Sequence, residues 1–264
     1  MLRTAIVLSL FIFTTAASAQ SQRQRTLSTH PTGGKTTELQ DVPPWLKNYD
    51  FREDKFTFVR TEYDGRTWAT DFPAADLNLT AQLGKLTKLD VSQPVRVLRL
   101  SDTELSNHRF AYLSEPGYLD LSETETTALR EYLVGGGFLM IDDFWGEAAW
   151  SNLRSVMKRV FPDREPKDLP LSHPLFHCIF DLKEKPQVTG IGAFLQGLTT
   201  ERADAQEVHY RVILDDDDRI MVLMGHNTDL ADGWEWVGEN QRYDREVVKP
   251  KALPMGINIV FYAD

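Results

Sequence analysis

The chain has 264 residues, of which 39 are acidic and 29 are Lys or Arg, and its formal net charge is −10. A chain with this balance is not expected to bind nucleic acid or an anionic membrane surface, since both require clustered basic residues. Cys178 is the single cysteine, which excludes an internal disulfide, so stability must come from the core that a chain of this length can bury.

The N-terminus has the pattern of a secretory signal peptide. Arg3 precedes an apolar run at 5–13, and the small residues Ala17-Ser18-Ala19 form a cleavage site. The run is shorter than the roughly 20 residues that span a bilayer. We therefore expect a cleavable signal peptide at 1–19 and an exported protein, periplasmic or secreted, with no transmembrane span after cleavage. Residues 20–41 are polar and predict a disordered leader, followed by a single α/β domain at 42–264.

The domain alternates strand and helix patterns. In chain order we predict a strand at 56–63, a helix at 76–89, strands at 95–100 and 110–113, a helix at 123–134, a strand at 138–141 and a helix at 147–160. Ser122 and Glu125 form a capping box for the helix at 123–134, which ends at Gly135-Gly136-Gly137. This order predicts a three-layer, doubly wound α/β fold with a mostly parallel sheet.

The last third of the chain has a different pattern. Two apolar segments, 208–214 and 220–224, flank the acidic turn Asp215–Asp218. They predict a β-hairpin inserted near an edge of the sheet. Residues 252–262 predict a closing helix that packs back on the sheet.

A set of motifs is spread over 55–264. They are Tyr63 to Asp76, Leu129 to Leu133, Phe138 to Asp143, Phe161-Pro162, Leu169-Pro170, His173 to Phe176, Asn227, Asp229, Gly233 to Glu235 and Gly256 to Val260. Together these motifs resemble a bacterial family known as domain of unknown function 4159. The resemblance implies a fold similar to class I glutamine amidotransferases and flavodoxin-like domains, in which ligands bind beyond the helix–Gly-Gly–strand unit. Catalytic amidotransferases carry a Cys on a strained elbow with His and Glu partners. Cys178 lacks the Gly-x-Cys-x-Gly elbow, so glutaminase activity is not expected.

Asp142 and Asp143 follow the apolar strand at 138–141. Ligands bind beyond the carboxyl ends of strands in open α/β sheets, so this pair could hold a metal or act as acid and base. In the alternative interpretation, Asp143 caps the following helix and Asp142 faces solvent.

Further acidic and polar candidates follow other predicted strands. Asp71 and Asp76 flank Phe72-Pro73 and could form a pocket wall, or instead serve in a turn and as the cap of the next helix. His226, Asn227 and Asp229 follow the strand at 220–224 and could line the same pocket, or form a turn rich in Asx residues.

His173 and His177 are four residues apart, and Pro174 could begin a helix that places both on one face. The pair is not a complete zinc site, so no metal centre is assigned. His173 could instead act alone in the pocket, bonded to a carboxylate, while His177 is structural.

These observations support three hypotheses. In the first, the protein is an exported, non-catalytic domain of the bacterial envelope that binds a small ligand or a partner protein. In the second, it is a hydrolase built from Asp71, Asp142, Asp143 and His173, with or without a divalent metal. In the third, it is a structural component of an envelope complex. The mark of such a component is an exposed apolar patch that includes tryptophans such as Trp145, Trp150, Trp234 and Trp236. Packing in the core is the more frequent role of such residues. Convergence of the carboxylates and His173 would favour the hydrolase.

Overall fold

The computed structural model describes residues 28–29, 35–37, 55–65, 67–92 and 94–263. The expected signal peptide lies outside the described residues. Of the expected leader, only the short strands β1 (Ser28–Thr29) and β2 (Lys35–Thr37) are described. Among the described residues, no helix has the length and apolar character needed to cross a bilayer.

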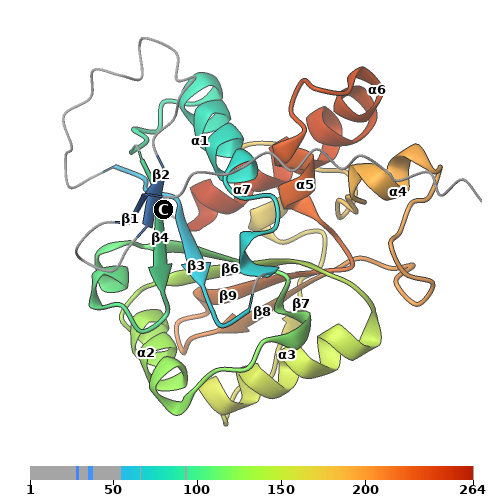
Figure 1. Ribbon diagram of the computed structural model, residues 1–264. Coiled ribbons are helices and arrows are strands. Elements are labelled where there is room, and N and C mark those ends of the chain that lie inside the picture. The colour runs from blue at the N-terminus through green and yellow to red at the C-terminus, as the bar shows by residue number, and fades with distance from the viewer. Residues whose placement is uncertain (1–27, 30–34, 38–54, 66, 93, 264) are drawn as a thin grey trace, which may run out of the picture.

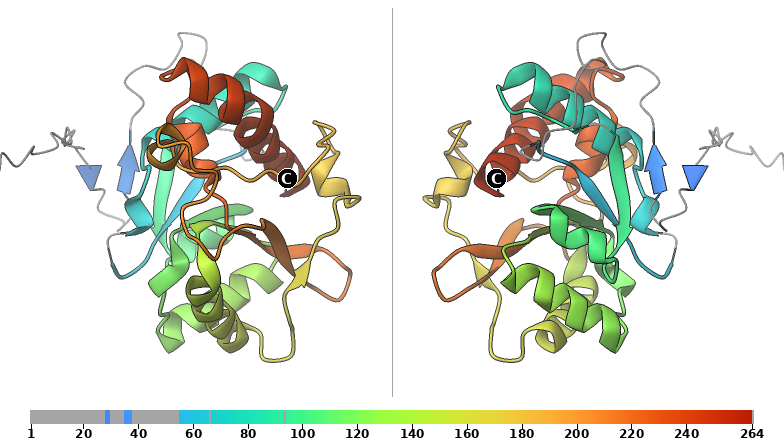
Figure 2. Two further views of the ribbon diagram at one scale, coloured as in Figure 1. Left: turned by 90° about the vertical axis from the view of Figure 1, so that its right-hand side faces the viewer. Right: turned by 90° about the vertical axis from the view of Figure 1, so that its left-hand side faces the viewer.

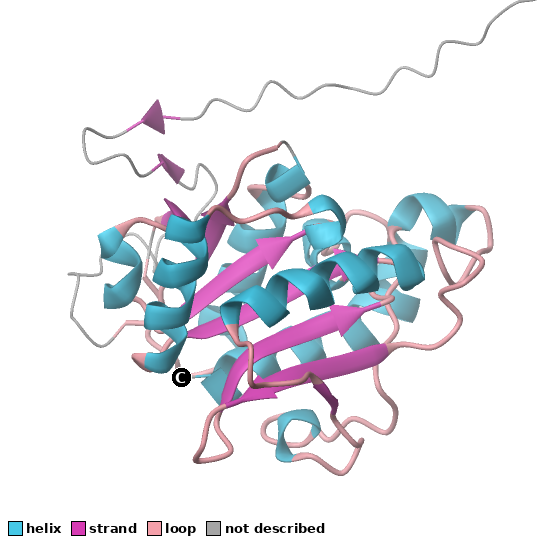
Figure 3. Cartoon of the chain, turned by 90° about the horizontal axis from the view of Figure 1, so that it is seen from below, coloured by secondary structure: helices cyan, strands magenta, loops and turns pink. Residues whose placement is uncertain are grey.

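The described part of the chain has an α/β fold built on a nine-stranded sheet with the order β1-β2-β4-β3-β5-β6-β9-β8-β7. Its other strands are β3 (Val59–Glu62), β4 (Val95–Arg99), β5 (Phe110–Ser114), β6 (Phe138–Phe144), β7 (Lys167–Asp168), β8 (His209–Leu214) and β9 (Ile220–His226). The five strands β4, β3, β5, β6 and β9 are parallel, and the remaining pairings are antiparallel. Figure 3 shows the central strands side by side.

Helices lie on both sides of this sheet (Figures 1 and 2). They are α1 (Ala74–Leu86), α2 (Glu123–Val134), α3 (Gly146–Val160), α4 (Ile191–Leu195), α5 (Leu230–Glu235), α6 (Gln241–Tyr243), a π-helical segment (Asp244–Ala252) and α7 (Leu253–Ala263). Helices α1, α5 and α7 pack together on one side, and α2 packs against α3 on the other. Apolar strands between two helical faces are buried on both faces, which explains why all seven residues of β6 are buried.

Several elements follow the sequence closely. Ser122 and Glu125 form both hydrogen bonds of the capping box, and α2 ends before Gly135. Helix α7 occupies the predicted closing segment. Strands β8 and β9 pair in antiparallel register around the acidic turn, and β9 also pairs with β6, so both strands extend the main sheet.

The strand order creates one special position in the sheet. Strand β4 follows β3 in the chain and lies on one side of it, whereas β5 lies on the other side. The chain therefore reverses direction across the sheet at β3, and this is the place where open α/β sheets form a ligand crevice beyond the carboxyl ends of their strands.

Candidate metal centre

Acidic residues follow the carboxyl ends of four neighbouring parallel strands. Asp71 lies in the loop after β3, Glu115 directly follows β5, Asp143 is the penultimate residue of β6, and Asp229 lies three residues beyond β9. Asp71, Glu115 and Asp143 all have left-handed backbone conformations, with φ of 59°, 47° and 57°. This conformation is uncommon for residues other than glycine and is retained chiefly where the surrounding structure enforces it. The fold thus imposes an unusual backbone conformation at the carboxyl edge of the sheet, where these acidic residues lie.

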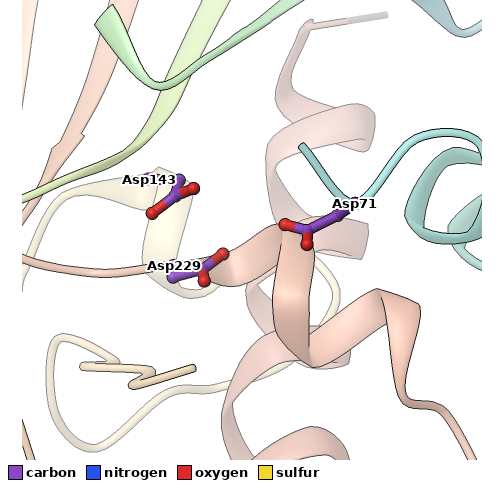
Figure 4. A group of neighbouring side chains, drawn as sticks. All are labelled: Asp71, Asp143 and Asp229. Atoms are coloured by element: carbon purple, nitrogen blue, oxygen red, sulfur yellow. The ribbon is translucent and has the colours of Figure 1, made fainter. Parts of the chain in front are cut away.

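Three of these carboxylates meet. Asp71, Asp143 and Asp229 each offer one oxygen, and the three oxygens lie within 4.8 Å of one another. Figure 4 shows the three side chains around a shared space. Asp143 and Asp229 are only 7% and 6% exposed, and Asp71 Oδ2 is closed to solvent without a hydrogen-bond partner. Asp229 Oδ1 accepts a hydrogen bond from the Asp232 amide, which caps α5 and fixes the orientation of this carboxylate.

The pKa values of all three carboxyl groups are raised. Burial raises the pKa of Asp143 and Asp229 well above the usual value, and neighbouring charges raise it further, chiefly that of Asp71 for Asp143 and that of Asp143 for Asp229. The pKa of Asp71 is also raised well above its usual value, first by burial and then by the charges of Asp232 and Glu235. Clustered buried carboxylates must either bind protons or hold a cation, because an unpaired buried charge is very costly.

The donor set of this centre suits a hard divalent cation. Its three oxygens lie within 4.8 Å of one another, which is close enough for one ion to contact all three. Calcium accepts six to eight oxygen ligands in flexible geometry, whereas magnesium demands near-ideal octahedral geometry and dehydrates reluctantly. A centre made of protein carboxylates therefore favours calcium over magnesium. The set is all oxygen, as hard cations prefer, and contains none of the His or Cys ligands that favour zinc.

Asp142, next to Asp143 in β6, holds the start of α5, where Asp229 is the N-cap. Asp142 is fully buried, and its Oδ2 accepts hydrogen bonds from the Leu230 and Ala231 amides at 2.8 and 3.1 Å. Burial raises the pKa of Asp142 to about 7, while those amide bonds oppose the shift. The prediction that Asp142 faces solvent is therefore wrong, because strand β6 extends past it into the protein interior. Asp143 does not cap α3 either, since Trp145 occupies the N-cap position.

Four further acids lie near this centre. Two of them, Asp232 and Glu235, form a second group with Asp71, with oxygens within 4.8 Å of one another. Asp232 Oδ2 accepts hydrogen bonds from the Ile191 amide and the Tyr243 hydroxyl, and burial raises the pKa of Asp232 to about 6. The other two are Glu115 and Glu201. Glu115 could have been found because it directly follows a predicted strand, whereas Glu201 lies in a long loop and carries no local signal.

Asp76 has a different role from either one predicted for it. It lies within α1, which begins at Ala74, and it is fully buried in an ion pair with Arg60. Arg60 Nε donates to Asp76 Oδ2 at 3.1 Å, and Nη1 donates to the carbonyls of Trp68 and Thr70. Asp76 therefore neutralises Arg60 beneath the loop that carries Asp71, and it is neither a pocket wall nor a helix cap.

The two histidines of the His-Pro-Leu-Phe-His motif do not join the acids. His173 caps the short 3₁₀ helix Pro174–Phe176 through its own Nδ1, and its ring contacts Tyr262. His177 contacts Asp181 and the Leu171 carbonyl. A 3₁₀ turn forms where an α-helix could have placed both rings on one face. Among the described residues, His173 contacts Leu175 and Tyr262 and no carboxylate. The structural role expected for His177 agrees with its contacts.

His226 and Asn227 hold the scaffold of the site. His226 is fully buried, stacks on Phe144 and contacts Arg211. Burial lowers the pKa of His226 to about 4, so it is neutral near pH 7. Asn227 accepts from the Gly146 amide and donates to the Glu207 carbonyl. Of the three candidates after β9, only Asp229 reaches the acidic centre.

A cleft of about 570 Å³ adjoins the centre through Asp143. It is lined by Thr67, Glu115, Gly117, Tyr118, Asp143, Phe144, Trp145, Ala148, Ala149, Asn152, Glu201 and Arg202. Cys178 lies elsewhere, where its thiol contacts the Leu175 and Asn258 carbonyls and burial raises the pKa of the thiol. A raised pKa disfavours the thiolate that a nucleophilic cysteine needs.

A known protein family matches the sequence over nearly all of the described fold. No curated protein matches the chain in sequence. The family model described as "Domain of unknown function (DUF4159)" matches residues 56–263, which include all the strands from β3 onward and every acid of the centre. The chain therefore belongs to the DUF4159 family.

Proposed function

We propose that this protein is an exported domain of the bacterial envelope that binds a hard divalent cation, with calcium favoured, and, with it, a ligand in the adjoining cleft. The observation that carries the proposal is the convergence of Asp71, Asp143 and Asp229 from three separate strand ends, with oxygens within 4.8 Å of one another. A hard cation stabilises such a group by replacing mutual repulsion with coordination. Export is supported by the signal-peptide pattern of the first 19 residues.

The fold similarity to class I amidotransferases and flavodoxin-like domains belongs to the same proposal. It is supported by the parallel strand order, by the reversal at β3 and by helices on both sides of the sheet. An amidotransferase-like scaffold without a nucleophile elbow is consistent with binding. The hydrolase hypothesis required His173, and the contacts of His173 with Leu175 and Tyr262 leave that hypothesis without its imidazole.

Thermal unfolding of the full mature protein tests cation binding. After chelation, calcium added at about 100 times its Kd is expected to raise the free energy of unfolding by about 2.7 kcal/mol. For a domain of this size, that corresponds to an increase in Tm of roughly 5–10 °C. Magnesium at the same concentration is expected to give a smaller shift.

Asp229→Asn removes the negative charge of one proposed ligand while it keeps a side chain that can cap α5. Asparagine is as good an N-cap as aspartate, so the bond from the Asp232 amide can persist while one ligand charge is lost. The variant is expected to fold, to equal or exceed the wild type in stability without cation, and to lose most of the calcium shift. Asp217→Asn, which removes a charge from an exposed turn, is the matched control and is expected to keep the full shift. Equal calcium shifts in Asp229→Asn and the wild type, or no shift in the wild type with calcium, magnesium or manganese, contradict the proposal.

A further inference from the structure

The cleft beside the acidic centre combines three kinds of surface. Glu115, Asp143 and Glu201 supply carboxyl groups, and Arg202 is the single basic residue among the described lining. Trp145 and Tyr118 supply aromatic rings. The volume of about 570 Å³ falls within the range of about 300–1,000 Å³ typical of small-ligand sites. The cleft is thus large enough for a ligand and is not a packing defect.

Each of the two aromatic residues has one feature that packing alone does not explain. Tyr118 is 93% exposed, although large aromatic rings are usually buried, and it lies in the 3₁₀ turn Pro116–Tyr118 directly after Glu115. Trp145 is 6% exposed, and its indole N–H is closed to solvent without a hydrogen-bond partner. Buried indole N–H groups usually have an acceptor. The cleft therefore offers an open ring at its rim, and one residue of its wall carries a hydrogen-bond donor that has no acceptor among the described residues.

The charge of the lining narrows the class of ligand. Three carboxyl groups against one guanidinium disfavour an anionic ligand. Hydroxyl groups both donate and accept, so they can bond to carboxylates and to an indole N–H alike. The aliphatic face of a sugar ring can lie against an exposed tyrosine, while its hydroxyls reach the acids.

The cation would contribute to the same ligand. Calcium takes six to eight oxygen ligands, so three carboxylates leave positions open for hydroxyl oxygens of a ligand. Asp143 belongs both to the acidic centre and to the cleft lining, which joins the two sites.

We propose that the cleft binds a neutral, hydroxyl-rich oligosaccharide, with Tyr118 as a stacking platform and Trp145 as a hydrogen-bond donor. This inference rests on the proposed cation site, because hydroxyl oxygens of the ligand complete the coordination of the cation that Asp143 holds beside the cleft.

Isothermal titration calorimetry of the calcium-loaded mature protein tests the inference with maltotriose, cellotriose and triacetylchitotriose as neutral probes. At least one probe is expected to bind, and chelation of calcium is expected to weaken its binding. Tyr118→Ala is expected to weaken binding roughly 2- to 10-fold, and Trp145→Phe, which keeps a ring but removes the N–H, by a similar factor. Tyr118 is so exposed that its removal leaves folding intact. Val134→Ala, at an exposed apolar position beyond the cleft lining, is the control and is expected to bind normally.

The outcomes separate the two proposals. If calcium raises the Tm but none of the three saccharides binds, the saccharide inference fails and the cation site stands. If calcium does not raise the Tm, the proposed function itself fails. Binding that neither Tyr118→Ala nor Trp145→Phe weakens would place the saccharide outside the cleft and overturn the inference. Binding of spermidine, with no binding of the saccharides, would assign the cleft to a cationic ligand instead.

Discussion

Asp71 and Asp76 are five residues apart, yet the structure gives them opposite electrostatic environments. Asp76 forms an ion pair with Arg60, and the Arg60 guanidinium also donates to two carbonyls and lies over the Tyr112 ring, with its carbon 4.4 Å from the ring centroid. Asp71 faces other carboxylates. Because the hydrogen bonds of Arg60 are directed to Asp76 and to backbone oxygens, a soluble cation is the natural counter-charge for the acidic centre.

At this scale we predict the effect of Asp76→Ala. Removing one partner of a fully buried ion pair leaves Arg60 charged and uncompensated, which is expected to lower the free energy of unfolding by about 3–5 kcal/mol. Chemical denaturation measures the change. Asp64→Ala is the control, because the Asp64–Arg99 pair is solvent-exposed and its loss should cost about 1 kcal/mol or less. Equal effects of the two substitutions would contradict this account.

At the scale of elements, local and long-range contacts position the site together. Helix α2 is fixed by its own capping box, whereas α5 depends on Asp142 of β6, which accepts the amides of Leu230 and Ala231. The position of Asp229 at the start of α5 thus follows from a bond made by the strand that also carries Asp143.

Ser122→Ala tests the local contribution. The Ser122 hydroxyl accepts the Glu125 amide at 3.2 Å, and Glu125 accepts the Ser122 amide at 3.0 Å. Loss of the cap is expected to lower the free energy of unfolding by about 1 kcal/mol, measured by urea denaturation. Thr124→Ala, at an exposed position of the same turn, is expected to change it by less than about 0.5 kcal/mol.

Gly256→Ala tests the contact between α7 and α5. A Cβ at position 256 would lie 2.8–2.9 Å from atoms of the Trp234 ring, and this ring is fully buried and bonded to the Ala252 carbonyl. Such crowding is expected to cost about 1–3 kcal/mol. Gly192→Ala, where a Cβ meets nothing within 4 Å, is expected to be neutral or slightly stabilising. A neutral Gly256→Ala would show that the two helices can separate freely.

For the whole molecule, the buried acids make stability depend on pH and on the cation together. Burial raises the pKa of Asp142 to about 7 in the folded protein, above the value of an unfolded aspartate. The folded state therefore holds a proton that the unfolded state has released, and this contribution is lost as pH rises through about 7. The pKa of His226 is lowered to about 4, so His226 has the opposite effect: it makes the folded state more stable as pH rises above about 4. This gain is complete before the pH at which Asp142 loses its proton.

We therefore expect the chelated protein to lose stability between pH 6 and 8, with Asp142 alone contributing about 1 kcal/mol. Calcium is expected to flatten this dependence, because ionised acids are its ligands. Asp142→Asn in the chelated protein is expected to flatten it as well. Denaturation midpoints at pH 6, 7 and 8 provide the measurement, and a stability that rises over this range would contradict the assignment.

The sequence by itself determined the elements and much of their order. The apolar run at 138–141, the capping box at Ser122 and the alternation of strand and helix are local patterns, and the α/β fold follows from them. Strand-end positions also identified Asp71, Asp143 and Asp229, because the carboxyl ends of parallel strands share one edge. Local patterns did not show that β6 continues through Asp142 and Asp143, since a charged residue ordinarily ends a buried strand.

Only the tertiary structure decided which acids meet. The order of strands in the sheet brings together residues more than 150 positions apart, and no local pattern encodes that order. It placed Asp76 against Arg60, left His173 at a 3₁₀ cap and added Glu115 and Glu201 to the cleft. The physical reason is that the role of a buried acid depends on the groups that surround it in three dimensions. Those groups are brought together by strand pairing between distant parts of the chain.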